Sequence, residues 1–238
     1  MTNHSMKLLN IFIVFQIFSF SSSAQTFIGI DAAVNTSHWT LSLNGSSLNY
    51  PNQPGWSAGV PVEFTLSKIF NLCTGIRYAN KGTTTIEFIF DNIKLDPVLS
   101  INYVEVPVLL KGKFGSEKIQ FNPIAGFSAG YGISGRIDDI VGDGNGVGHI
   151  HNRSVNFTND EINRLNIQLH IGAGATFVLS SGKLFFDIQY LHGLTNLSSS
   201  YAFENEDSYS VNAHGFELSI GYLFRIGKDN PSETPAVK

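Results

Sequence analysis

The 238-residue sequence has one cysteine, few charged residues and no basic surplus. The single thiol, Cys73, excludes an internal disulfide, and its distance from the N-terminus excludes the lipid-modified cysteine of a lipoprotein. We interpret Cys73 as a small residue on a strand and not as a reactive thiol. Charged residues make up 14% of the chain, below the ~25% typical of soluble domains. Because the net charge is -4, no nucleic-acid partner is expected.

Long uncharged apolar runs are also missing, except for one near the N-terminus. This run, residues 8–20, follows Lys7 and precedes small residues that end at Ala24. That order is typical of a secretory signal, so we expect residues 1–24 to be a signal peptide that is removed on export. The alternative is an uncleaved membrane anchor, for which the run falls short of the ~20 residues of a spanning helix. The sequence therefore predicts no helical span in the mature chain.

A period of two between apolar and polar residues is the main pattern that is present. It is clearest in residues 101–115, where Val104, Val106, Val108 and Leu110 alternate with a set that carries every charge of the stretch. This alternation predicts a strand with one apolar and one polar face. About a dozen residues exceeds the usual ~5–6 of a strand and suits a tilted strand that crosses a bilayer, which needs roughly 9–11.

The same alternation recurs along the chain. The predicted strands are residues 26–37, 55–67, 69–80, 101–115, 119–134, 163–179, 183–194 and 212–226. The connections between them alternate long and short, as in bacterial barrels with long outer loops and short periplasmic turns. We therefore predict an all-β fold, an eight-stranded antiparallel transmembrane up-and-down β-barrel over residues 25–227. Residues 228–238 are polar with two prolines and are predicted to be a disordered tail.

The direction of the two faces separates two kinds of barrel. A soluble lipid-binding barrel would turn its apolar face inward around a ligand. Here the apolar face is continuous and aromatic, which favours lipid outside and the polar face within. Because an unpaired charge in a narrow interior is costly, we expect the acids and bases of the polar face to pair and leave no open pore. This predicted lumen charge network consists of Glu63, Arg77, Glu105, Lys111, Lys113, Asp187, Glu217 and Arg225.

Two stretches resemble a known family. The run from Tyr103 to Lys111, YVEVPVLLK, resembles the central-strand signature of the outer-membrane β-barrel domain family of the PorT type, whose members are small OmpA/OmpX-like bacterial barrels. Residues 215–227, GFELSIGYLFRIG, are similar to the closing strand of that family. The resemblance covers residues 25–227 and implies a barrel in the bacterial outer membrane. PorT itself is linked to protein secretion and gliding, and nothing in this chain selects that role.

Two loop motifs suggest metal binding, and both are incomplete. The sequence from Asp143 to Gly146, DGNG, is similar to a calcium loop but has no glutamate at the twelfth position. His149 and His151 have no third ligand nearby in the sequence. We interpret both motifs as polar loop, so the sequence predicts no metal and no cofactor.

Three histidines raise the question of catalysis. His170, His192 and His214 lie near serines and acids, as in outer-membrane enzymes that modify lipids, but no nucleophile elbow accompanies them. We therefore predict no catalytic residues and a structural or binding role. Residues 38–54 and 135–162 are the predicted contacts for an extracellular protein or glycan, because loops on a rigid scaffold usually carry recognition.

Other functions stay open at this point. One alternative is a small pore or an accessory of transport or secretion, and a further alternative is a lipid-modifying outer-membrane enzyme. For the predicted barrel we expect contact with outer-membrane lipids and a monomeric state.

Overall fold

The computed structural model describes residues 25–43, 46–84, 88–90, 93–95, 98–142, 148–160, 162–198 and 209–226. The predicted signal peptide and the predicted polar tail lie outside these described residues. Within them, all regular elements are β-strands. No helix in this part of the chain is long and apolar enough to cross a membrane.

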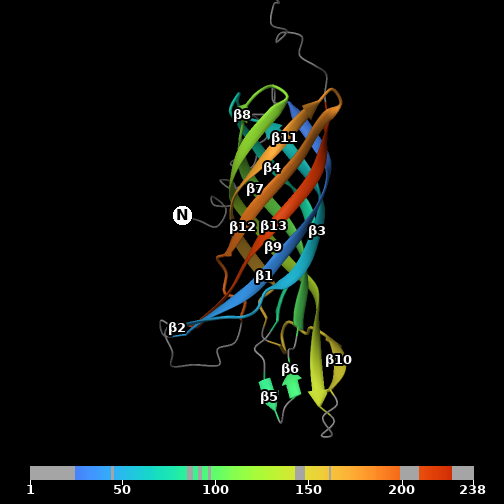
Figure 1. The fold of residues 1–238 in the computed structure, drawn as a ribbon, viewed down its shortest axis with the longest axis vertical. Coiled ribbons are helices and arrows are strands. Elements are labelled where there is room, and N and C mark those ends of the chain that lie inside the picture. Colours follow the sequence, from blue (N-terminus) through green and yellow to red (C-terminus); the bar gives the residue numbers. More distant parts are fainter. Residues whose placement is uncertain are drawn as a thin grey trace, which may run out of the picture.

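Eight long strands form the body of the described structure (Figure 1). They are β1 (Thr26–Leu43), β3 (Gln53–Thr65), β4 (Phe70–Thr84), β7 (Val98–Gly112), β9 (Ile119–Gly142), β11 (Leu165–Leu179), β12 (Gly182–Gly193) and β13 (Tyr209–Ile226). Antiparallel pairing runs in the order β9-β11-β12-β13-β1-β3-β4-β7, and β7 pairs again with β9. The pairing thus closes the eight described strands into a ring. The prediction of an eight-stranded antiparallel up-and-down barrel is confirmed.

Shorter strands extend the ring at its two ends. They are β2 (Ser46–Asn49), β5 (Phe88–Phe90), β6 (Ile93–Leu95), β8 (Phe114–Gly115) and β10 (Gly148–Ser154). β2 pairs with β1, β10 pairs with β9, and β5 pairs with β6, all beyond the same end of the barrel (Figure 1). We call this end, which the long connections reach, the outer end. β8 and the short turns lie at the opposite end.

The segments expected to be loops at the outer end are therefore partly strands. β1 and β13 stay paired up to Leu43 and Tyr209, and β9 continues to Gly142. The sequence prediction ended these strands earlier, because their outward positions become polar there. Their inward positions stay apolar: Trp39 and Leu41 pack against a buried cluster that includes Val211 and Ala213.

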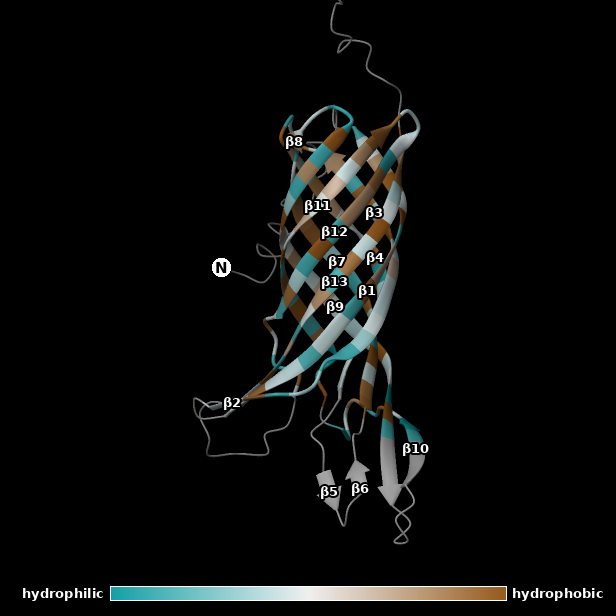
Figure 2. Cartoon of the chain, in the orientation of Figure 1, coloured by the Kyte–Doolittle hydropathy of each residue, from teal (hydrophilic) through white to brown (hydrophobic). Residues whose placement is uncertain are grey.

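An apolar belt covers the outside of the ring. On β7, Val104, Val106, Val108 and Leu110 are exposed, whereas Glu105 between them is buried. Figure 2 shows the same alternation of hydrophobic and hydrophilic residues along the strands. Soluble monomers rarely expose contiguous apolar patches larger than a few hundred Å². A belt around the whole ring therefore fits a lipid surrounding.

Apolar layers close the interior towards both ends. Towards the short turns, Phe27, Phe185 and Leu223 form a buried cluster. Towards the outer end, a larger buried cluster includes Tyr103 and Phe157. Phe157 belongs to the segment after β10, so this segment packs over the outer end of the interior. Inward-facing charged residues such as Arg77, Glu105 and Glu217 lie between these two layers.

The outward direction of the apolar belt predicts a difference between two Leu→Arg substitutions. Leu218 is 57% exposed on β13, within the belt, and Leu48 is 46% exposed on β2, beyond it. We expect Leu218→Arg to lower the free energy of unfolding in lipid vesicles by about 2–4 kcal/mol, because an arginine near the bilayer midplane is poorly solvated. Leu48→Arg should change it by less than about 0.5 kcal/mol.

Urea titration of both variants in vesicles gives these free energies. Equal effects of the two substitutions would show that the belt does not face lipid.

Candidate functional site

Charged side chains from six strands meet inside the ring. The acids are Asp31 on β1, Glu63 on β3, Glu105 on β7, Asp187 on β12 and Glu217 on β13, and the bases are Arg77 and Lys81 on β4, Lys111 on β7 and Lys183 on β12. We call these nine residues the interior network. Each of their side chains is at most 8% exposed. A charge buried this deeply persists only with a partner.

Two lysine ion pairs of the interior network cross the lumen. Lys183 Nζ donates a hydrogen bond to Glu63 Oε1 at 2.5 Å, and Lys111 Nζ donates to Asp187 Oδ2. The first pair joins β12 to β3 and the second joins β7 to β12. Neither of these strand pairs is adjacent in the ring. The side chains therefore span the interior and occupy its cross-section.

Arg77 is shared between two carboxylates. Its Nη1 donates to Glu217 Oε1 at 2.6 Å, and its Nε lies 3.2 Å from Asp31 Oδ2. Its Nη2 donates to Ser57 Oγ at 2.9 Å, and this hydroxyl donates in turn to Glu217 Oε2 at 3.0 Å. The guanidinium thus joins β1 and β13 to β4 through side chains alone and adds a side-chain contact to the paired β3. A planar cation with several donors suits such a shared position.

The last ion pair lies nearer the outer end. Lys81 Nζ donates to Glu105 Oε1 at 2.6 Å and to Gln168 Oε1 at 2.7 Å. The amide of Gln168 extends the polar contacts of the interior to β11. The interior network therefore forms a series of charged contacts along much of the barrel.

Inward-facing glycines make room for these long side chains. A Cβ added at Gly59 would lie 2.5 Å from Arg77 Cγ, and a Cβ at Gly174 would clash with Asp187 Oδ1. Each glycine leaves space beside a charged residue of a neighbouring strand. The small and large residues on the polar faces are thus complementary across strands.

A small polar cavity lies among these charged residues. A cavity of about 40 Å³ is lined by Asp31, Arg77, Lys111 and Asp187, among other residues. One oxygen each of Asp31 and Asp187 is buried without a hydrogen-bond partner in the described structure. A polar cavity of this size has room for one or two water molecules. It has no room for a wide aqueous passage.

The structure brings together six of the eight residues predicted for the lumen charge network: Glu63, Arg77, Glu105, Lys111, Asp187 and Glu217. Lys113 and Arg225 lie elsewhere. Lys113 follows the end of β7, where its Nζ donates to the Ser67 carbonyl at 2.6 Å, and Arg225 is exposed near the end of β13. Burial and the nearby charge of Lys183 lower the pKa of Lys113. Both residues occupy positions that alternate with outward-facing ones and so point inward, but they lie at the end of the barrel, where the interior meets solvent.

Three members of the interior network were missing from the sequence prediction. Asp31 lies on the polar face of the first predicted strand and Lys183 begins the seventh, so the alternation contained the signal for both. Lys81 follows directly after the predicted end of residues 69–80, whereas β4 continues to Thr84. Each residue lies an even number of positions from buried polar residues of its strand and therefore faces the same side.

Metal ligands are a separate question. Among the described residues, no group of three or more His, Cys, Asp or Glu side chains is arranged to hold a metal ion. The predicted loop from Asp143 to Gly146 lies outside the described residues.

A closed antiparallel ring with an apolar outside and a charged inside defines a small transmembrane β-barrel. Residues 20–199 match the model of a family described as outer membrane protein beta-barrel domain. The chain belongs to this family, whose members are proteins of the bacterial outer membrane. No curated protein matches the chain.

Solved outer-membrane barrels are similar to the chain in fold. Ail of Yersinia pestis is 15% identical, with 83% of this chain and 98% of Ail covered and a TM-score of 0.35. OprG from Pseudomonas aeruginosa is 10% identical, with 87% and 99% covered and a TM-score of 0.41. A major outer membrane protein from Thermus thermophilus is 11% identical, with 81% and 99% covered and a TM-score of 0.44. At these identities the likeness concerns the fold alone.

The ion pair between Lys111 and Asp187 can be tested with a double-mutant cycle. Lys111→Met leaves the Asp187 carboxylate buried without its cation, so we expect the free energy of unfolding to fall by about 3–5 kcal/mol. Adding Asp187→Asn should recover most of this loss, because no unpaired charge is then buried. Lys113→Met, outside the interior network, should cost less than about 0.5 kcal/mol.

Urea unfolding in lipid vesicles, followed by tryptophan fluorescence, measures all three variants. A Lys111→Met effect as small as that of Lys113→Met would contradict the burial of this pair.

Proposed function

We propose that this protein is a non-conducting, non-enzymatic barrel that serves a structural or binding role through the segments at its outer end. The observation that carries the proposal is the filled interior. Ion pairs such as Lys183–Glu63 and Lys111–Asp187 cross the lumen, and apolar clusters lie towards both ends of it. A rigid scaffold with a filled interior leaves its outer segments as the place for recognition.

The filled interior argues against the alternative of a small pore or transport accessory. An ion that entered from the outer end would first meet the buried cluster that contains Leu99, Ile101 and Phe157. It would then have to separate Lys81 from Glu105 and Arg77 from Glu217. Breaking buried pairs of this kind costs several kcal/mol each.

The surroundings of His170 argue against the alternative of a lipid-modifying enzyme. His170 Nε2 lies 2.8 Å from Ser128 Oγ, and its Nδ1 lies 3.0 Å from Gln189 Oε1. This geometry is similar to a hydroxyl, a base and an orienting group. All three side chains are at most 3% exposed inside the ring, where a lipid substrate has no access. We therefore assign His170 to the packing of the interior.

The outer end offers an ordered surface for a partner. At the end of β10, Arg153 Nη1 donates to both oxygens of Asp160 at 2.8 and 2.9 Å, and the Asn156 backbone amide donates to Asp160 Oδ2 at 2.8 Å. Phe157 anchors this segment in the barrel under the guanidinium of Arg164, which lies 4.0 Å from the ring centroid. We propose that this segment and β2 contact an extracellular protein or glycan. No nucleic acid and no second copy is needed for this role.

Two finer assignments belong to the same proposal. We assign the chain to the PorT type within its family, on the strength of the runs 103–111 and 215–227. We also propose export by a signal peptide of residues 1–24 that is cleaved after Ala24.

The orientation of the barrel can be measured with two matched serine variants. Ser47 lies on β2 at the outer end and Ser116 lies in a turn at the opposite end, and both are exposed. The native Cys73 is buried and should react little. We expect a membrane-impermeant maleimide to label Ser47→Cys on intact cells, and Ser116→Cys only after the outer membrane is permeabilised. The reverse pattern would place the long connections in the periplasm and overturn the proposed role.

The non-conducting interior can be measured in planar lipid bilayers. We expect the purified wild-type barrel to give no steady current, under conditions in which a general porin conducts. A steady ion-selective conductance that is lost in Arg77→Ala or Glu105→Ala would instead support the pore. Heat-dependent gel mobility of each sample checks that the barrels are folded.

A further inference from the structure

Three histidines lie side by side on the outside of the barrel. His38, His214 and His192 come from β1, β13 and β12, three consecutive strands of the ring. His214 is the register partner of both His38 and His192. The ring centroids of His38 and His214 are 5.7 Å apart, and those of His192 and His214 are 4.6 Å apart. We call these three residues the histidine rim.

The histidine rim marks the outer edge of the apolar belt. All three residues have the same parity as outward-facing neighbours, and His192 is exposed. The next outward position towards the barrel centre is occupied by Tyr190 on β12 and Phe216 on β13, whose rings are 5.2 Å apart. In the other direction the next outward positions on β1 and β13 are the polar residues Thr40 and Asn212, and Leu194 follows the end of β12. The rim therefore lies at the level of lipid head groups.

The rim is rich in donors and poor in negative charge. His214 Nδ1 is buried without a hydrogen-bond partner in the described structure. His38 Nδ1 lies 2.9 Å from Asn52 Oδ1 on the β3 side. The titratable side chains that face His214 from the adjacent strands are the other two imidazoles, with the Tyr190 phenol next to His192. Protonated imidazoles this close together repel one another, and a bound anion would relieve that repulsion.

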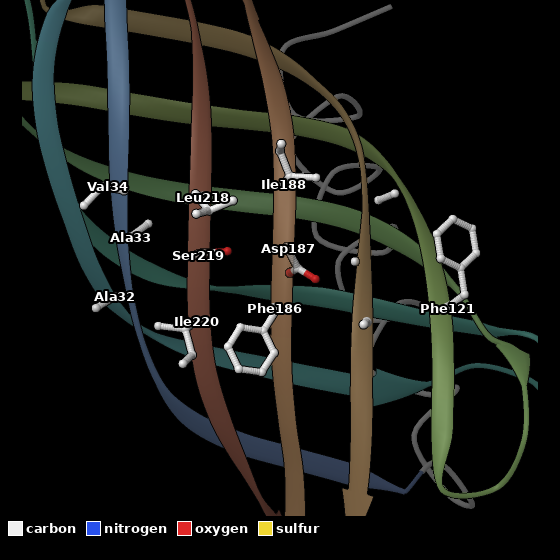
Figure 3. A pocket seen from close by; sticks show the side chains of 13 residues that line it. Ala32, Ala33, Val34, Phe121, Phe186, Asp187, Ile188, Leu218, Ser219 and Ile220 are labelled. Atoms are coloured by element: carbon white, nitrogen blue, oxygen red, sulfur yellow. The ribbon is translucent and has the colours of Figure 1, made fainter.

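An apolar groove lies deeper on the same side of the barrel. Its outward-facing lining includes Ala32, Ala173, Ala175, Phe121, Phe186 and Leu218, and its volume is about 680 Å³. Phe121 on β9 and Phe186 on β12 are large side chains at the groove (Figure 3), and both are register partners of the small Ala175 on β11. The surface is therefore hollowed along β11. We call this hollow the belt groove.

The register sets the distance between the rim and the belt groove. Val34 and Ala32 lie four and six residues from His38 on β1, and both line the groove. At ~3.3 Å per residue this is roughly 13–20 Å along the strand, or roughly 9–14 Å in depth for a strand tilted by ~45°. Half of a hydrocarbon core measures about 15 Å. An acyl chain whose head group is at the rim can thus reach the groove within the same leaflet.

From this arrangement we propose that the histidine rim binds the phosphate of an outer-leaflet lipid, one acyl chain of which packs into the belt groove. The rim supplies imidazole N–H donors, which bind phosphate oxygens most strongly when the ring is charged. The belt groove supplies an apolar surface of matching depth. This site does not depend on the partner proposed for the outer segments. It explains why a donor cluster without carboxylates lies at the head-group level, on the side where the belt is hollowed.

Lipid binding can be counted by native mass spectrometry of the full barrel released from a neutral detergent. The probes are phosphatidylglycerol, diacylglycerol with the same acyl chains, and glycerol phosphate without chains. Phosphatidylglycerol keeps one charge throughout, so any pH dependence belongs to the protein. We expect one phosphatidylglycerol to bind about tenfold more tightly at pH ~5.5 than at pH ~8, because protonated imidazoles attract the phosphate. The other two probes should bind at least about tenfold more weakly.

Variants separate the head-group contact from the groove. We expect the double variant His192→Gln and His214→Gln to lose about tenfold in affinity at low pH, together with the pH dependence. Ala173→Phe should weaken binding at both pH values, because it fills the belt groove. The matched controls are Asn102→Gln and Ala129→Phe, outward-facing changes on β7 and β9 that should leave binding unchanged. If the double variant does not fold, His192→Gln alone, at an exposed position, gives the same test.

Four outcomes would overturn the proposal. Equal binding of diacylglycerol would remove the role of the phosphate, and equal binding of glycerol phosphate would show a site for a free anion. Unchanged binding in the histidine variants would place the lipid elsewhere. Binding that requires Zn²⁺ and is lost with a chelator would turn the rim into a metal site. None of these outcomes depends on the orientation or the conductance of the barrel. Failure of this lipid proposal would therefore not contradict the proposed function.

Discussion

The constraint on which this structure depends is the closure of the strand ladder. Inside a bilayer no water is available, so each backbone N–H and C=O must find its partner within the protein. The pairing of β9 with both β11 and β7 meets this demand, because it leaves no strand of the ring with an open edge at membrane depth. Closure then fixes the side chains, because alternate residues must face either lipid or the interior. The apolar belt and the interior network are two consequences of the same ladder.

A ring of eight strands has a narrow interior, and its width limits which side chains can face inward. At this size the side chains fill the lumen. Long cationic side chains such as Lys183 and Lys111 reach across it, and glycines such as Gly174 face the groups that need space. Buried ion pairs are weak evidence for stability, since apolar residues of the same volume often serve as well. They do constrain the register, because each cation matches a particular carboxylate, and a shifted strand would leave both unpaired.

The sequence predicted all eight long strands because lipid imposes the alternation wherever a strand crosses the membrane. The strand prediction was incomplete where strands extend beyond the membrane, because lipid no longer imposes the alternation there. Beyond the belt, β1 and β13 remain paired up to Leu43 and Tyr209 although their outward positions are polar there, and Lys81 was missed because β4 continues past the predicted strand end. Alternation gives the direction of a side chain and says nothing of its depth, which is why Lys113 and Arg225 were included in the predicted network. The partners across the lumen depend on the stagger of non-adjacent strands, which one sequence does not contain.

A filled barrel moves recognition to its surface, and the outer surface here is not the same all around. On β4 and β7 the edge of the belt carries Asn80 and Asn102, whose side chains bond to each other at 2.7 Å. On β1, β13 and β12 the same edge carries the three histidines of the rim, whose rings can take up a proton, whereas amides cannot. The small residues on β11 hollow the belt on this second side. Neither feature is needed to close the ring or to fill it, since an asparagine edge and an even belt would serve the fold equally well. The histidine rim and the belt groove lie on one side of the barrel at matching depths, and the fold requires neither. In a barrel of this size, such features are the ones that can serve a specific function.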